Sequence, residues 1–132
     1  MALKIWMRAV GVLYLAMFVA AAIIRAPIRT LGVPGTLERA AAGDATAKFL
    51  VDTWFALGVE FATVGVALLV GSRAPARARS LVYTVLGIET VRAAVTDLHW
   101  IVNGYDLTVH GVWIAIHSVV VATGVIAVRR TP

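Results

Sequence analysis

Cysteine is absent from the 132-residue chain, and charged residues are scarce, at 14% of the sequence. The lack of cysteine excludes disulfides, thiolate metal ligands and dithiol redox chemistry. Soluble domains carry about 25% charged residues. The low charged fraction, together with 61% hydrophobic residues, therefore indicates an integral membrane protein. The net charge of +5 would suggest nucleic-acid binding in a soluble protein. Here the basic residues flank apolar runs, so membrane lipids are the expected partners and nucleic acid is not.

Four apolar runs are long enough to cross a bilayer. They predict an all-α integral membrane protein in which residues 1–132 form one domain, a four-transmembrane-helix bundle. The expected spans cover residues 5–24, 49–70, 81–102 and 109–128. The first run has a signal peptide as its alternative interpretation, because small residues follow it at Ala20–Ala22. The apolar character of the rest of the chain favours a span.

The distribution of lysine and arginine predicts the orientation of these spans. In a four-span arrangement seven bases lie on one side, namely Lys4, Arg8, Arg73, Arg77, Arg79, Arg129 and Arg130. The other side has four, namely Arg25, Arg29, Arg39 and Lys48. Basic residues are enriched in cytoplasmic loops. Both termini are therefore expected in the cytoplasm, and the chain is expected to be a multi-pass protein of a bacterial inner membrane.

The third run contains several polar residues in an otherwise apolar stretch. A charge at the bilayer centre costs about 2.5–3.5 kcal/mol on insertion scales, so such residues tend to face a bundle interior and to mark function. Residues three or four apart share a helix face. This spacing places one stripe on the third helix, formed by Glu89, Arg92, Thr96, His99 and Asn103. Asp97 falls well off the stripe.

A second glutamate, Glu60, is expected at the same depth. Leu57–Glu60 in the second run matches Leu86–Glu89 in the third, and the two glutamates differ in depth by only about 3 Å at 1.5 Å per residue. We expect Glu60, Glu89 and Arg92 to form the floor of a polar site and His117 its wall. The site would continue toward the outer face along Thr96, His99, Asp52, Asn103 and Trp113.

These residues have three other interpretations. The charged groups could form a structural network that fixes the register of the bundle. A metal site is disfavoured, because di-iron bundles use Glu-x-x-His and the corresponding position after Glu89 is Arg92, which repels cations. A haem bound by His99 and His117 is also disfavoured. No metal and no cofactor are therefore expected.

Short motifs along most of the chain are similar to those of a known family. They are Asp52–Phe55, Leu57–Glu60, Leu86–Glu89, Val91–Arg92, Asp97, Gly104–Tyr105, and Trp113–Ile114 followed by His117. With these motifs the chain resembles the BphX-like family, small bacterial membrane proteins, some from clusters for aromatic-compound breakdown. In the family pattern a glycine follows the arginine of the third span, where this chain has Ala93. The resemblance implies four spans and brings no established chemistry.

These observations support three hypotheses about function. The first is a membrane-embedded binding protein for a small lipophilic or aromatic molecule, with a pocket that opens outward. In an enzymatic version a buried carboxylate would act as an acid. The second is a small proton-coupled transporter of lipophilic compounds that works as a homo-oligomer. The third is a structural or assembly subunit, and the residues alone do not decide whether the protein is an enzyme.

Overall fold

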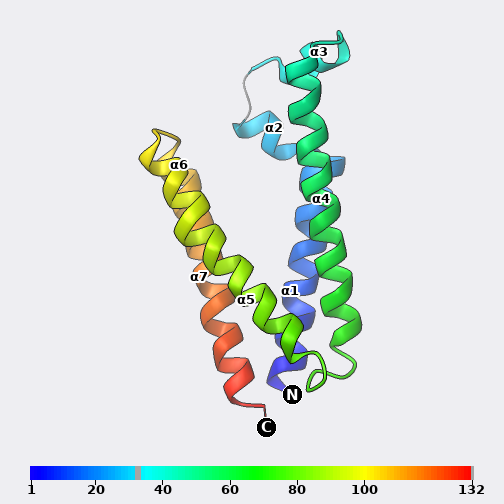
Figure 1. Cartoon of the computed structure of the whole chain (residues 1–132), viewed down its shortest axis with the longest axis vertical. Helices are drawn as coiled ribbons and strands as arrows, with labels where there is room; N and C mark the ends of the chain where they lie inside the picture. Colours follow the sequence, from blue (N-terminus) through cyan, green and yellow to red (C-terminus); the bar gives the residue numbers. More distant parts are fainter. Residues whose placement is uncertain (32–33, 132) are drawn as a thin grey trace. The chain divides into compact units, whose positions relative to one another are not determined.

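The computed structural model describes residues 1–31 and 34–131, and every regular element among them is helical (Figure 1). The all-α expectation is therefore confirmed for this part of the chain. In chain order the elements are α1 (Ala2–Phe18), the π-helical turn η1 (Val19–Ile23), α2 (Ala26–Leu31), α3 (Thr36–Ala41), α4 (Ala45–Gly71), α5 (Arg79–Val91), the π-helical turn η2 (Arg92–Asp97), α6 (Leu98–Val102) and α7 (Leu107–Arg129).

Aspartate side chains cap the two longest helices. The Asp44 carboxylate accepts a hydrogen bond from the backbone N–H of Ala47 at 2.8 Å, before the first turn of α4. The Asp106 carboxylate accepts one from the N–H of Val109 at 2.9 Å, at the start of α7. The first N–H groups of a helix have no partner within it, and a carboxylate also suits the positive end of the helix dipole. These caps fix where α4 and α7 begin.

Three helical stretches are long and apolar enough to cross a membrane, and they indicate a membrane protein. They are Ala2–Ile23, Ala45–Gly71 and Leu107–Arg129. The expectation of four such helices is corrected to three within residues 1–31 and 34–131. The run 81–102 is helical, but it is divided into α5, η2 and α6 and carries Glu89, Arg92 and Asp97. Three charged residues make it less apolar than the other three.

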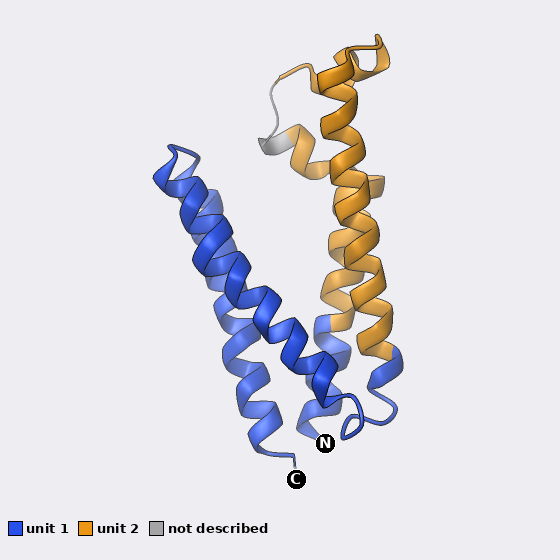
Figure 2. Ribbon diagram, in the orientation of Figure 1, with its two compact units in different colours: residues 1–10, 70–132 blue, residues 11–69 orange. Residues whose placement is uncertain are grey.

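The chain divides into two compact units (Figure 2). Unit 1 contains Met1–Val10 and Val70–Pro132, and unit 2 contains Gly11–Leu69. Helix α1 therefore contributes its first part to unit 1 and its remainder to unit 2.

Unit 2 is held together by close contact between α1 and α4. A Cβ added at Gly65 would lie 2.9 Å from the carbonyl oxygen of Gly11, and one at Gly58 would lie 2.8 Å from the Cβ of Ala22. The rings of Tyr14 and Phe61 meet edge to face, with centroids 5.8 Å apart. Small residues let helix backbones approach closely, as is typical of membrane helix pairs.

Unit 1 packs the first turns of α1 against α5 and α7. The Trp6 Nε1–H lies 3.2 Å from both the Val120 carbonyl oxygen and the Thr123 Oγ1. A Cβ on Gly124 would collide with Trp6 and Leu86. The small residue at 124 is therefore needed where these three helices meet.

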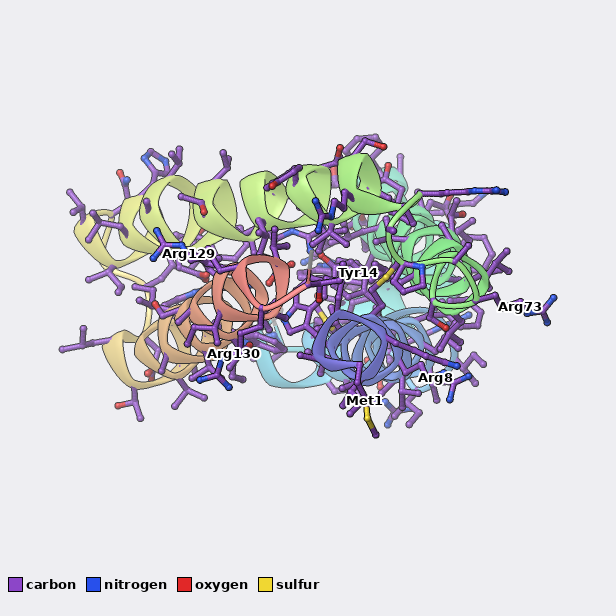
Figure 3. All side chains as sticks on the ribbon, turned by 90° about the horizontal axis from the view of Figure 1, so that it is seen from below. Met1, Arg8, Tyr14, Arg73, Arg129 and Arg130 are labelled. Carbon is purple, nitrogen blue, oxygen red and sulfur yellow. The ribbon has the colours of Figure 1, made fainter. Side chains whose placement is uncertain are left out.

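Basic residues gather at the end of unit 1 that holds both chain termini. Figure 3 looks onto this end and labels Arg8, Arg129, Arg130 and, further out to one side, Arg73. The Arg8 Nε–H donates to the Ser72 hydroxyl at 3.4 Å.

Candidate functional site

The candidate site lies in unit 1, where α5, η2 and α6 run alongside α7 in the opposite direction (Figure 1). Four ionisable side chains are almost completely buried between them. The exposed fractions are 2% for Glu89, 5% for Asp97, 2% for His110 and 5% for His117. Buried charged groups are costly unless they are paired. Their partners therefore define the site.

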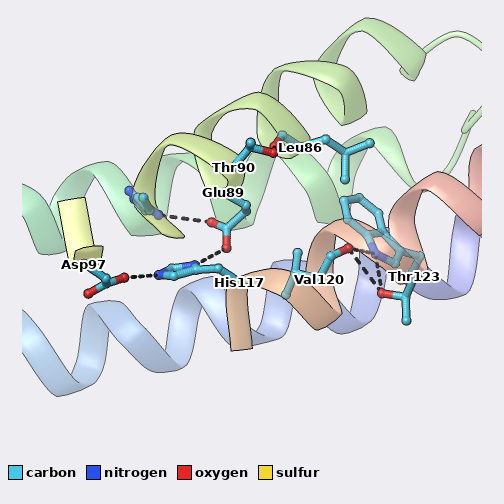
Figure 4. Close-up of polar contacts among 9 residues, drawn as sticks. Leu86, Glu89, Thr90, Asp97, His117, Val120 and Thr123 are labelled. Atoms are coloured by element: carbon cyan, nitrogen blue, oxygen red, sulfur yellow. Dashed lines mark hydrogen bonds and ion pairs between the residues drawn. The ribbon is translucent and has the colours of Figure 1, made fainter. Parts of the chain in front are cut away.

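These side chains form one connected series with Arg92, which we call the polar chain. The Arg92 Nη1–H donates to Glu89 Oε1 at 3.2 Å. The second oxygen of Glu89 lies 2.6 Å from His117 Nδ1 (Figure 4). His117 Nε2 lies 3.4 Å from Asp97 Oδ2, and Asp97 Oδ1 lies 3.0 Å from His110 Nδ1. The order is Arg92, Glu89, His117, Asp97, His110.

Both ring nitrogens of His117 contact a carboxylate, which restricts how this imidazole can form hydrogen bonds. A neutral imidazole has one N–H donor, yet both ring nitrogens of His117 face a carboxylate. Either His117 is protonated on both nitrogens, or one carboxyl group carries the proton. In both cases one additional proton balances the charge, because two carboxylates face the single fixed charge of Arg92.

The π-helical turn η2 brings Asp97 into the polar chain. In a regular α-helix Asp97 would lie about 80° around the axis from Glu89, because eight residues make about 2.2 turns. A π-helical turn takes up one extra residue, which reduces the offset to about 20°. Asp97 therefore faces α7 on the same side as Glu89.

The same turn displaces part of the expected stripe. His99 and Asn103 are exposed, while Arg92 and Thr96 are half-buried. The Asn103 Nδ2–H donates to the His99 carbonyl oxygen at 2.7 Å. The stripe assumes α-helical spacing from Glu89 to Asn103. This spacing applies between Glu89 and Arg92, but η2 interrupts it before His99 and Asn103.

Comparison with protein families gives a match over nearly the whole length. The model of the BphX-like family matches residues 1–131. The chain belongs to the BphX-like family. The resemblance inferred from its motifs is thereby confirmed. Comparison of this BphX-like chain with curated proteins and with solved structures finds no match. The chemistry must therefore be argued from the polar chain itself.

Of the sequence-predicted residues, the structure of this BphX-like chain brings together Glu89, Arg92 and His117. Trp113 lies beside them, with its ring centroid 6.0 Å from that of His117. Glu60 and Asp52 belong to unit 2, where both side chains are exposed, and neither takes part in the polar chain. The glycines of the two matching segments, Gly58 in Leu57–Glu60 and Gly87 in Leu86–Glu89, also differ in their surroundings. Gly58 is in close contact with Ala22, whereas a Cβ on Gly87 would meet nothing within 4 Å.

Sequence reasoning left two members of the polar chain out of the predicted site. His110 lies seven residues before His117, two helical turns away on nearly the same face of α7, and this spacing could have identified it. Asp97 could not be identified in this way, because no residue pattern predicts a π-helical turn at residues 92–97.

The far end of the polar chain is surrounded by aromatic rings. The Trp100 ring meets His110 edge to face at a centroid distance of 4.9 Å, and Tyr105 does so at 6.1 Å. Tyr105 is exposed, and it lies in the turn between α6 and α7. His110 is thus the member of the polar chain nearest to that turn. Among the described residues, no group of three or more acidic or histidine side chains is placed to hold a metal ion.

Proposed function

We propose that this protein is a small membrane transporter that couples proton movement through the polar chain to movement of a lipophilic compound. The observation that supports it is the contact of one imidazole, His117, with two buried carboxylates. Carboxylates and imidazoles can each accept and release a proton, and imidazoles do so near neutral or mildly acidic pH. Arg92 contributes a fixed charge that keeps the one-proton state neutral.

Proton transfer along the polar chain balances without any other reactant. When protonated His117 gives its Nδ1 proton to Glu89, it becomes neutral and retains the proton on Nε2. When it gives the Nε2 proton to Asp97 instead, it retains the one on Nδ1. If the Asp97 carboxyl group then rotates so that its O–H faces His110, and His110 is the tautomer with an unprotonated Nδ1, Asp97 can pass that proton to His110, beside the exposed Tyr105. The number of protons is conserved in each step.

We propose four spans, with residues 79–102 as the third in the chain. This stretch is helical throughout and exceeds the length needed to cross a hydrocarbon core of about 30 Å. Its three charged residues have partners in the polar chain, which lowers the cost of placing them in a membrane. An even number of spans puts both termini on one side. By the positive-inside rule that side is the cytoplasm of a bacterial inner membrane.

The lipophilic nature of the transported compound is part of the proposal. The helix that carries Glu89 and Asp97 exposes apolar side chains around them, with Val91 at 55%, Val95 at 60% and Leu98 at 50% exposed. A compound dissolved in the bilayer could reach the polar chain over this surface. A chain of this size would act as a homo-oligomer.

A preformed binding pocket for the compound has less support. A described pocket of about 190 Å³ lies in unit 2, lined by residues of and around α2 and α3 that include Ile28, Arg29 and Glu38. None of its lining residues belongs to the polar chain. We therefore place the proton-coupled function before a static binding protein.

Infrared difference spectra recorded between acidic and neutral pH would test proton binding. The wild-type protein should show a protonated carboxyl band that disappears in Glu89→Gln or Asp97→Asn. Glu60→Gln is the matched control, because Glu60 is exposed and outside the polar chain. A band that is unchanged in both Glu89→Gln and Asp97→Asn would contradict the proposal.

The coupled function needs a flux measurement. In liposomes with a trapped pH-sensitive dye, the wild-type protein should dissipate a pH gradient faster when lipophilic compounds are added, and Glu89→Gln should not.

The orientation in the membrane is tested by single cysteines at Ala76 and Thr108, both exposed. Thr108→Cys should react with an impermeant maleimide on intact cells and Ala76→Cys should not.

A further inference from the structure

The position of η2 suggests how the proton could control the shape of the protein. A π-helical turn is rare and usually occurs as a single turn within an α-helix, frequently at functional sites. Here it spans Arg92–Asp97, so that it begins and ends on two members of the polar chain. Conversion of this turn to regular α-helix would rotate the following residues by about 100° around the helix axis. This is the rotation per residue in an α-helix, which has 3.6 residues per turn.

Rotation would exchange the side chains that face α7. In the structure Asp97 faces His110 and His117, while His99 and Asn103 are exposed. In a fully α-helical register Asp97 would move to the side of the helix. Thr96 and Asn103 would then face α7, with His99 closer to it, because these residues continue the α-helical stripe from Glu89. Each register therefore presents its own set of polar side chains to α7.

The groups around Asp97 explain what holds the observed register. From α7 it is faced by His110 at 3.0 Å and His117 at 3.4 Å. On its own helical stretch the nearby ionisable groups are Glu89 and Arg92, which are in the polar chain, and His99, which is exposed. An ionised Asp97 is a strong acceptor for N–H groups of the imidazoles on α7. A neutral Asp97 holds these imidazoles less strongly, and the α-helical register then gains the advantage of regular hydrogen bonding.

We propose that η2 is a proton-controlled register switch, in which protonation of Asp97 converts the π-helical turn to α-helix and rotates α6. This inference rests on the proposed function, for which the rotation supplies the conformational step. It extends that function by naming the moving element. The movement requires no change in α7, which contributes His110 and His117 in both registers.

Deletion of one residue from the turn provides a direct test. Deletion of Ala94 removes the extra residue, so that a regular α-helix then places Asp97 on the same face as Glu89. The polar chain should remain, and with it the protonated carboxyl band. The switch should be locked, so that proton flux coupled to lipophilic compounds is lost. If the deletion variant shows wild-type coupled flux, the switch is excluded.

The register can also be measured without any deletion. His99→Cys introduces the sole cysteine of the chain, at a position exposed in the observed register. Its reaction with a water-soluble maleimide should slow at acidic pH, since rotation turns residue 99 toward α7. Adding Asp97→Asn, which mimics the protonated side chain, should make the reaction slow at every pH. In the Ala94-deletion background it should stay fast at every pH.

These outcomes separate the switch from the function on which it rests. If labelling at position 99 does not depend on pH while the carboxyl band is present and sensitive to Asp97→Asn, the switch is wrong and proton binding stands. If the carboxyl band is unchanged in Glu89→Gln and Asp97→Asn, the proposed function fails as well. Labelling of a cysteine at Thr108, which lies beyond the rotating segment at the start of α7, corrects for the effect of pH on thiol reactivity.

Discussion

The two helix pairs of this protein are held together in different ways. In unit 2, α1 and α4 meet through Gly11, Gly58 and Gly65, where backbones come close. In unit 1, α5, η2 and α6 meet α7 through the polar chain. Close approach of small residues and the edge-to-face contact of Tyr14 with Phe61 join the first pair. The second pair carries buried charge, which adds no dependable stability but fixes which residues must face each other.

The two π-helical turns show the same difference. The turn η1 consists of alanine, valine and isoleucine residues, and its backbone bond runs from the Ile24 N–H to the Val19 carbonyl oxygen at 2.9 Å. No titratable side chain belongs to η1, whereas η2 contains Arg92 and Asp97. A π-helical turn is therefore not by itself a functional signal in this chain. Its contact with ionisable partners distinguishes η2.

The largest expected effect is on the polar chain. Asp97→Ala should lower the stability of the folded protein by about 3–5 kcal/mol, because it leaves the buried His110 without its carboxylate and removes one of the two carboxylates beside His117. Thermal melting in detergent at neutral pH measures the loss. Asp52→Ala, at an exposed position, is the matched control and should change little. If both variants melt alike, the polar chain contributes no more than a surface residue does.

The corresponding change in unit 2 tests packing by shape. Gly65→Ala should cost about 1–3 kcal/mol, because the added methyl group meets the rigid backbone of Gly11. Gly87→Ala adds the same methyl group where nothing lies within 4 Å. It should leave the melting temperature unchanged or raise it, since alanine favours helix. Equal destabilisation by both would show that loss of glycine, not crowding, matters.

A double-mutant cycle refines the comparison for a single pair. Glu89→Gln and Arg92→Gln, singly and together, should show a coupling of about 0.5–3 kcal/mol. The pair is connected at 3.2 Å and the Arg92 side chain is 23% exposed, so solvent weakens the interaction only in part. Strictly additive effects on melting would mean that the two charges do not interact in solution.

The smallest expected effect concerns the cap of α4. The Ala47 N–H bonded to Asp44, and then the Arg39 guanidinium beside it, hold the pKa of the Asp44 carboxyl below its ordinary value of 3.8. Because the folded pKa is the lower one, the stabilisation is present above the unfolded pKa and is lost as pH falls through the folded value. Melting curves below about pH 4 should therefore fall less steeply with pH for Asp44→Asn than for wild type. Parallel curves would exclude this contribution.

Sequence patterns predicted much of this structure, and the failures have physical causes. Apolar runs and their helical character follow from composition, and spacing correctly joined Glu89 to Arg92. His117 was expected beside them from its depth, and it contacts Glu89. Asp97 was missed because helical spacing assumes 3.6 residues per turn throughout, which one π-helical turn invalidates. Among the described residues three long helices, not four, are apolar enough to cross a membrane by composition, because residues 81–102 carry three charged side chains.

The contact of Trp6 with α7 has a consequence for biosynthesis. Its partners, Val120 and Thr123, are more than 110 residues away in the chain. A ribosome therefore makes the tryptophan more than 110 residues before these partners, and the indole cannot form this contact until they have been synthesised. Contacts so distant in sequence form late. Until then the Trp6 indole has no hydrogen-bond partner on α7. A C-terminal truncation that removes Val120 and Thr123 would leave the indole without these partners permanently.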